Sequence, residues 1–166
     1  MNLFRDIANI FISTLPTSSL FNLKRFLIRI GGAQIAEGVC VNGHSWFYGR
    51  GKIIIGSNSW IGVGCKFYSV KGNVIQIGKN CDIAPEVIFV PGTHKAGTFE
   101  RRAGEGLALD IKIGDGCWIG TRVTILGGVT IGSGVMIAAG AVVCKDVPDN
   151  CLIAGVPAEI KKYFEN

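Results

Sequence analysis

Two histidines, His44 and His94, are the side chains of this 166-residue chain best suited to moving protons near neutral pH. An unperturbed imidazole titrates at about pH 6.5, so its neutral form can take the proton of a hydroxyl group. His94 begins a long charged segment, HKAGTFERRAGEGLAL, that interrupts an otherwise regular sequence. His44 lies within the regular part, where we expect a structural role. The sequence therefore points to His94 as a general base, and a solvated loop histidine is the alternative.

A histidine base works best when its second ring nitrogen is held by a carboxylate or a carbonyl oxygen. Glu86, in the segment IAPEVIF, is the first candidate for this role because it precedes His94 by only eight residues. Asp82, Glu100 and Glu105 are the other candidates. Each of these acids could equally be a solvated surface residue.

The six cysteines form no Cys-x-x-Cys pair, which indicates free thiols in a reducing cytoplasm. Cys81 and Cys117 are expected to share an internal column, so a disulfide or a metal site is the alternative reading for this pair. A zinc site of three histidines is excluded because the chain has two. We therefore expect no metal ion.

Composition and charge place the chain among single-domain globular proteins with many turns. It is 48% apolar and 17% charged, and glycine occupies 24 of its 166 positions, about twice the usual share of roughly 7%. The net charge of +5 suits a polyanionic small molecule. Because no run of Lys and Arg resembles a nucleic-acid-binding arm, we expect no nucleic-acid partner.

A repeat of six residues organises most of the chain. From residue 113 onward an aliphatic residue opens each block of six: Ile113, Ile119, Ile125, Ile131, Ile137 and Val143. This period fits neither an amphipathic helix nor an alternating strand, but it is typical of a parallel β-helix built from hexapeptides. Three blocks make one coil of 18 residues, so the frame predicts about five coils over residues 35–148, with a long loop at residues 94–109.

The frame also predicts which side chains stack on one another in successive coils. Phe47, Phe67 and Phe89 each open the third block of a coil, so their rings should form an internal column. Trp60, Asp82 and Trp118 share an outward position and should form a row on one face.

The two ends of the repeat should be capped, because no single coil can bury its apolar face alone. Residues 1–34 show an apolar helical pattern broken at Pro16, and residues 149–166 end in PAEIKKYFEN, which predicts a short helix. Residues 2–30 also carry Lys24, Arg25 and Arg29 beside an apolar stripe. Peripheral contact with the inner face of a membrane is therefore an alternative to simple packing over the first coil.

The segments IGDGCWIGTRVTILGGVTIGSGVMIAAGAVVCKDVP and IAPEVIFVPGTHKAG resemble the bacterial hexapeptide-repeat O-acetyltransferases. This family includes galactoside and maltose acetyltransferases and enzymes that acetylate surface polysaccharides, and the resemblance covers about residues 35–162. It implies a left-handed β-helix, a homotrimer with active sites between subunits, acetyl-CoA as the donor, and His94 as the catalytic base.

The resemblance also implies which residues bind the two substrates. Donor contacts map onto Thr121, Ala139, Cys144 and Lys162, and the nearby cation Lys145 is added on sequence grounds. Trp118 resembles a tryptophan that walls the acceptor pocket, with a subunit contact as the alternative. We group Asp82 with it because the two share a row.

The sequence indicates the acceptor substrate less specifically than the donor. Arg101 and Arg102, in the long loop, could bind an anionic acceptor, with a solvated loop as the alternative. We expect a cytoplasmic enzyme that acetylates a hydroxyl group of a sugar or glycan, such as a unit or precursor of a surface polysaccharide. The alternatives are N-acetylation of an amino-sugar nucleotide, acetylation of an antibiotic, or a noncatalytic β-helix scaffold.

Overall fold

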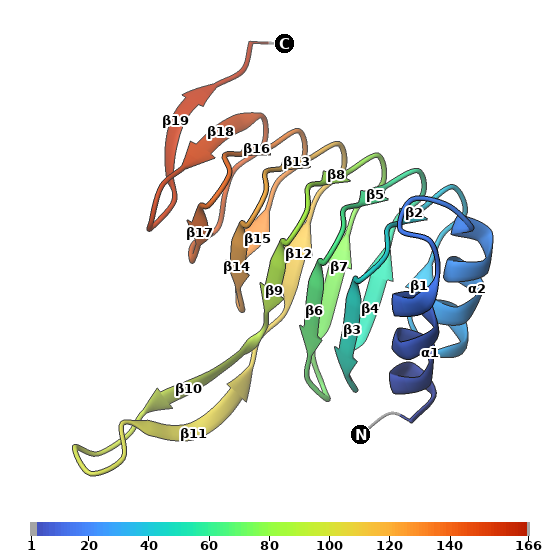
Figure 1. Cartoon of the computed structure of the whole chain (residues 1–166). Coiled ribbons are helices and arrows are strands. Elements are labelled where there is room, and N and C mark those ends of the chain that lie inside the picture. The colour runs from blue at the N-terminus through green and yellow to red at the C-terminus, as the bar shows by residue number, and fades with distance from the viewer. Residues whose placement is uncertain (1–2, 166) are drawn as a thin grey trace.

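The computed structural model describes residues 3–165 and shows a three-sided prism of short strands with two helices at its N-terminal end (Figure 1). Residues 1, 2 and 166 of the expected caps lie outside the described residues. The chain visits the three faces of the prism in turn, and each strand pairs in parallel with the strand of the next coil. We name the faces A, B and C in the order in which the chain reaches them.

The strands of each face follow one another along the prism. Face A contains β1 (Gln34–Ile35), β4 (Lys52–Ile55), β7 (Val74–Ile77), β12 (Ile111–Ile113) and β15 (Thr130–Ile131). Face B contains β2 (Cys40–Val41), β5 (Trp60–Ile61), β8 (Asp82–Ile83), β13 (Trp118–Ile119), β16 (Met136–Ile137), β18 (Cys151–Ala154) and β19 (Glu159–Tyr163). Face C contains β3 (Trp46–Gly49), β6 (Lys66–Ser69), β9 (Ile88–Val90), β14 (Thr124–Leu126) and β17 (Val142–Val143).

The core is the inside of the prism, and the hexapeptide frame predicts it well. The block-opening residues are buried, and in-register pairing stacks like on like from coil to coil. The predicted aromatic column is confirmed, because the rings of Phe47, Phe67 and Phe89 stack with 4.7 Å between successive centroids. That spacing is the distance between neighbouring strands, so one ring fills each coil.

The N-terminal cap consists of α1 (Leu3–Thr14) and α2 (Phe21–Ile30), which pack on each other and on the first coil. The buried Arg5 guanidinium donates to the carbonyl oxygens of Gly49 (3.0 Å) and Gly51 (3.1 Å). Asn9 makes two hydrogen bonds with the backbone of Phe47, at 2.9 and 3.0 Å. In the interior of the prism, the backbone groups of a coil are bonded by the strand of the preceding coil. At the first coil these polar side chains take the place of that strand, so the cap is held by specific hydrogen bonds as well as by apolar packing.

The basic residues of α2 do not form the free cationic stripe that the sequence suggests. Lys24 is fully buried, and its ammonium donates to the carbonyl oxygens of Pro16 (2.7 Å) and Thr17 (2.8 Å). Arg25 and Arg29 both pair with Glu37. Sequence periodicity could not predict the burial of Lys24, because its hydrogen-bond partners are carbonyl groups of the turn between the two helices. No helix within residues 3–165 is long and apolar enough to cross a membrane.

The long segment after face C is an antiparallel hairpin rather than an irregular loop. β10 (Gly92–Ala96) pairs with β11 (Ala103–Ala108), and the hairpin stands away from the prism (Figure 1). Gly97 and Gly104 permit the close approach near its tip, since a Cβ on Gly97 would lie 2.3 Å from the carbonyl oxygen of Arg101.

The expected C-terminal helix is wrong, because Glu159–Tyr163 form the strand β19. This strand turns back and pairs antiparallel with β18 on face B. The last parallel strand of a β-helix exposes an unpaired edge, and covering that edge with backbone hydrogen bonds outweighs the helical preference of a short polar segment.

Candidate active site

His94 lies on β10, at the point where the hairpin leaves the corner between faces C and A. It is paired with Gly106 on β11, and its side chain is exposed. A Cβ on Gly106 would come within 3.9 Å of the His94 ring, so the absence of a side chain there keeps one side of the imidazole open. Within residues 3–165 the imidazole has no hydrogen-bond partner, which leaves both ring nitrogens accessible to a substrate or to another subunit.

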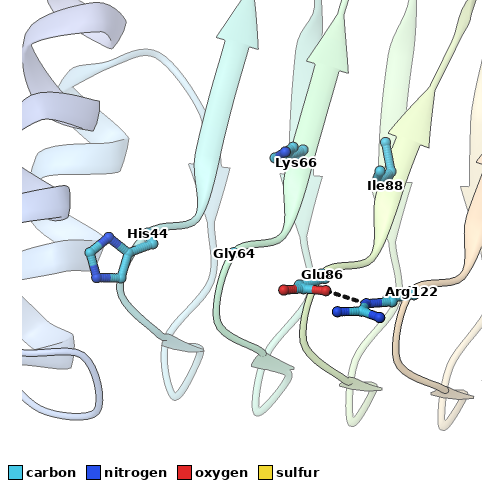
Figure 2. Close-up of a pocket in the computed structure, with 6 residues that line it drawn as sticks. All are labelled: His44, Gly64, Lys66, Glu86, Ile88 and Arg122. Atoms are coloured by element: carbon cyan, nitrogen blue, oxygen red, sulfur yellow. Dashed lines mark hydrogen bonds and ion pairs between the residues drawn. The ribbon is translucent and has the colours of Figure 1, made fainter.

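Glu86 lies at the corner between faces B and C, where its backbone has a φ of 61°. Its carboxylate accepts a hydrogen bond of 2.5 Å from Nε of Arg122, on the next coil of the same corner (Figure 2). This hydrogen bond and the charge of Arg122, with a smaller contribution from Lys66, hold the pKa of Glu86 below its ordinary value. The structure therefore brings Glu86 together with Arg122, and its expected role beside His94 stays a prediction.

A hollow of about 600 Å³ opens beside the same corner (Figure 2). It is lined by His44, Gly64, Lys66, Glu86, Ile88 and Arg122. Gly64 has no side chain to fill the space between His44 and Glu86, so the corner is indented at this coil.

A second, more apolar groove of about 360 Å³ runs from face B to its corner with face C. Trp118, Thr121 and Ala139 line it, together with Met136 and Leu152. The groove therefore gathers two of the four donor-binding residues implied by the resemblance and the expected acceptor-wall tryptophan. Small residues form part of its surface, which suits an extended ligand.

The predicted outward row on face B is confirmed by the strand register. Trp60 pairs with Asp82, and Asp82 pairs with Trp118. Asp82 thus lies between two exposed indole rings, on the coil that precedes the groove. Met136 and Leu152 continue the same row, and the six-residue frame could have found them, although we did not single them out.

The other predicted donor residues lie toward the C-terminal end of the prism. Lys162, on β19, pairs with Leu152, which lines the groove. Cys144 is exposed just after β17. Lys145 lines a separate hollow of about 280 Å³ with Glu159, so the structure does not place it in the groove of Trp118.

The two candidate acceptor arginines lie between β10 and β11, at the far end of the hairpin from the prism. Both Arg101 and Arg102 are exposed, and Arg102 donates to the carbonyl oxygen of Gly97 at 3.2 Å. Phe99, which sequence analysis did not single out, is 83% exposed at the same tip. Single exposed apolar side chains are common on protein surfaces, so Phe99 alone does not indicate a ligand.

His94 and the groove cannot form one site within a single chain. The corner between faces C and A, which carries His94, is opposite face B in a three-sided prism, and Trp118 lies on face B. A site that uses both therefore requires two copies of the chain.

Comparisons with known proteins identify what the chain resembles. A family model described as bacterial transferase hexapeptide (six repeats) matches residues 110–145. The galactoside O-acetyltransferase of Escherichia coli (strain K12) is 36% identical over 124 residues, which cover 64% of this chain and 61% of that protein. Overall, the chain spans 48% to 61% of the length of the first curated relatives that it matches.

Two solved structures extend the comparison. The polySia specific acetyltransferase NeuO is 31% identical, with a TM-score of 0.65 over 81% of this chain and 59% of that chain. A galactoside acetyltransferase in complex with coenzyme A is 24% identical, with a TM-score of 0.73 over 99% of this chain and 80% of that chain. These likenesses support the left-handed parallel β-helix that the resemblance implies.

Proposed function

We propose that the chain, which resembles the hexapeptide-repeat acetyltransferases, transfers an acetyl group from acetyl-CoA to a hydroxyl group of a sugar. Two observations together support the proposal. His94 is exposed on the hairpin, and a groove on the same chain is lined by Trp118, Thr121 and Ala139. The galactoside and polySia acetyltransferases that the chain resembles act on sugars, which supports a carbohydrate acceptor.

Acetyl-CoA would lie in the groove between faces B and C. Thr121 and Ala139 form its floor, and Lys162 lies beside Leu152 at its far end, where it can meet a phosphate group. A Cβ on Gly120 would lie 2.6 Å from the backbone nitrogen of Ala139, so this stretch cannot carry larger side chains. Cys144 and Lys145 complete the proposed contacts, with Lys145 reaching from the neighbouring hollow.

The reaction needs two proton transfers, one from the acceptor hydroxyl group to His94 and one from His94 to the leaving sulfur. The neutral His94 ring takes the proton of the acceptor hydroxyl while the oxygen attacks the thioester carbonyl carbon. The tetrahedral oxyanion then collapses, the carbon–sulfur bond breaks, and the protonated ring returns its proton to the coenzyme A sulfur. A base positioned in this way contributes about 10²–10⁴ in rate. The backbone N–H of Gly120 already donates to the carbonyl oxygen of Ile137 at 2.8 Å, so the N–H of Thr121 is the proposed stabiliser of the oxyanion.

The acceptor would lie against the row of Trp60, Asp82 and Trp118. The apolar face of a sugar ring packs on an indole ring, and the Asp82 carboxylate accepts hydrogen bonds from sugar hydroxyl groups. Arg101 and Arg102 add positive charge at the hairpin tip, which favours an anionic glycan, such as a unit or precursor of a surface polysaccharide. Glu86 remains a candidate for orienting His94.

The active unit would be a homotrimer, since His94 and Trp118 must come from different copies. Outward apolar side chains support this assembly, because Trp60 is 41% exposed and Trp118 is 54% exposed in the single chain. A row with two large exposed aromatic rings on one face is a candidate contact surface between copies, because aromatic residues are enriched at interfaces.

We place the enzyme in the cytoplasm, with its N-terminal cap toward the inner face of the membrane. The outer sides of both helices expose large apolar residues, namely Leu3, Phe4, Ile7, Ile10, Phe11, Leu23, Phe26 and Ile30. Because the basic residues are engaged within the chain, the contact would rest on apolar insertion rather than on attraction to anionic lipids. Co-sedimentation with neutral phosphatidylcholine vesicles tests this, and a Phe4→Ser/Phe26→Ser variant that still sediments equally would contradict it.

A thiol-release assay with acetyl-CoA against sugars, sugar nucleotides and glycan oligomers tests the proposed reaction. We expect turnover with hydroxyl acceptors, and with anionic glycans above neutral ones. Turnover only with amino-sugar nucleotides would replace the proposal with N-acetylation.

A further inference from the structure

Two corners of the prism turn through left-handed backbone, but they use different residues. The corner between faces A and B uses residue types that tolerate this conformation, namely Gly38, Asn58, Asn80, Gly116, Gly134 and Asn150. The corner between faces B and C instead includes His44, Glu86 and Arg122, whose φ values are 60°, 61° and 59°. Because left-handed backbone is unfavourable for Glu and Arg, their presence indicates that these side chains have a use at this corner.

The side chains of this second corner form one wall of the hollow of about 600 Å³ (Figure 2). Lys66 on β6 and Ile88 on β9, which pair in register on face C, line its other side. A Cβ on Gly64 would meet only Cγ of Glu86 within 4 Å, at 3.6 Å, so a side chain there would project into open space. The hollow therefore has the size of a small-molecule site, since such sites occupy about 300–1,000 Å³.

The hollow carries more positive than negative charge. Its carboxylate, Glu86, accepts a hydrogen bond from Nε of Arg122, and within residues 3–165 the two terminal nitrogen atoms of Arg122 have no partner. The ammonium of Lys66 makes no hydrogen bond or ion pair with the described part of the chain. The hollow thus offers an anionic ligand two cationic groups, and the guanidinium can bind a carboxylate or a phosphate through two N–H groups.

The hollow meets the groove of Trp118 along the same corner. Thr121 lines the groove, and the next residue, Arg122, lines the hollow. From this point the groove extends toward the C-terminal coils, to Leu152, whereas the hollow extends toward the N-terminal coils, to His44. Because acetyl-CoA would enter the groove at this corner, the corner has to remain accessible in the active enzyme. The hollow lies on the side that the donor leaves free.

The hollow is also within reach of a glycan that packs on the proposed acceptor row. Trp60, a member of this row, precedes Gly64 by four residues, a path of about 13 Å at roughly 3.3 Å per residue. One sugar ring on the row does not extend that far, whereas further units of an oligosaccharide do. Ile88 gives such a unit an apolar surface, and Lys66 and Arg122 give it cations.

We infer that the hollow is a second acceptor subsite, which binds an anionic sugar unit of the glycan that is acetylated. Lys66 and Arg122 hold the anionic group, which is a carboxylate or a phosphate. The inference rests on the proposed function, because it takes the acceptor row and the donor groove from it. Its consequence is that acidic oligosaccharides are preferred over neutral ones and over single sugars.

Calorimetric titration tests the inference with three probes: tetragalacturonate, maltotetraose with a terminal phosphate, and neutral maltotetraose. At least one anionic probe should bind wild type about tenfold or more tighter than maltotetraose, and the probe that does so identifies the group as carboxylate or phosphate. Lys66→Glu should lose that preference. Lys52→Glu, exposed on face A of the same coil, is the matched control and should keep it. Equal binding by wild type and Lys66→Glu, or no binding of either anionic probe, would overturn the inference.

A second pair of variants keeps the test independent of charge. Gly64→Asn puts a side chain into the hollow, and asparagine suits the φ of 72° there, as it does at Asn58. This variant should lose binding of the anionic probe. Gly72→Asn, on the same coil but outside the hollow, should keep it, since its φ is also positive and a Cβ there meets no atom within 4 Å. Tight binding to both variants would mean that the probe lies elsewhere.

Two further measurements separate the subsite from the proposed function. The anionic probe should bind with the same affinity in saturating coenzyme A, and competition would put it in the donor groove and refute the subsite. Thiol release from acetyl-CoA tests the reaction itself. If sugars support thiol release but Lys66→Glu binds like wild type, the proposed function stands alone. If the hollow binds the anionic probe but no sugar supports thiol release, the binding site stands and the proposed function fails.

Discussion

Arg122 and Glu86 are 36 residues apart in the sequence, yet they occupy the same position on adjacent coils, and Nε of Arg122 donates to the Glu86 carboxylate at 2.5 Å. The hydrogen bond and the charge of Arg122 lower the pKa of Glu86. Both side chains are more than half exposed in the single chain, so solvent screening keeps the contribution of this pair to folding small.

The same pair predicts a pH dependence. A carboxyl group whose pKa is lower in the folded chain than in the unfolded chain stabilises the fold fully above the ordinary glutamate value of about 4.3. This stabilisation is lost as the pH falls through the lowered value. The free energy of unfolding of wild type should therefore fall slightly more steeply in mild acid than that of Glu86→Gln, by a small amount because both side chains are exposed. Denaturant titrations at several pH values measure this, and parallel curves for the two proteins would count against the role of the pair.

The groove predicts a selective defect in donor binding. Ala139 is exposed and lines the groove beside Trp118, so Ala139→Phe should fill the space of the coenzyme. We expect its Kd for coenzyme A to rise at least about tenfold, which is the effect of losing roughly 1.4 kcal/mol of binding. Calorimetric titration measures this. Gln76→Phe, an outward position on face A, serves as the control and should bind coenzyme A normally.

The aromatic column predicts a large effect on stability. Phe67 is fully buried between Phe47 and Phe89, so Phe67→Ala removes a ring from the centre of a stack that cannot close up. We expect a loss of about 3–5 kcal/mol in the free energy of unfolding, measured by denaturant titration. Gln76→Ala, on an exposed position, should shift stability by no more than about 0.5 kcal/mol. Similar midpoints for both variants would mean that the column is not tightly packed.

The six-residue period made most of the prism predictable, because every inward position repeats with the same chemistry at a fixed spacing. Phe47, Phe67 and Phe89 could be stacked from their positions alone, and Trp60, Asp82 and Trp118 could be put in a row. The six-residue period predicts nothing for segments that lie outside the repeat. The strand at Glu159–Tyr163 follows from an open sheet edge, which a local helical preference does not reveal.

The candidate site was predictable only in part for a related reason. Sequence adjacency suggested Glu86 as a partner for His94, whereas the coil geometry pairs it with Arg122, a residue of the next coil. Lys24 looked like a surface cation because its acceptors, the carbonyls of Pro16 and Thr17, have no signature in a sequence pattern. Contacts made through the backbone or between coils need the fold before they can be assigned.

The most decisive prediction concerns His94. Because His94 is exposed on the hairpin and makes no hydrogen bond within residues 3–165, His94→Ala should leave folding, trimer formation and coenzyme A binding nearly unchanged. Turnover should nevertheless fall by about 10²–10⁴, with the loss in kcat rather than in donor affinity. Thr98→Ala, exposed on the same hairpin, should retain its rate. A His94→Ala enzyme that keeps more than about a tenth of the wild-type rate would require another base, or an acceptor amine that is already unprotonated.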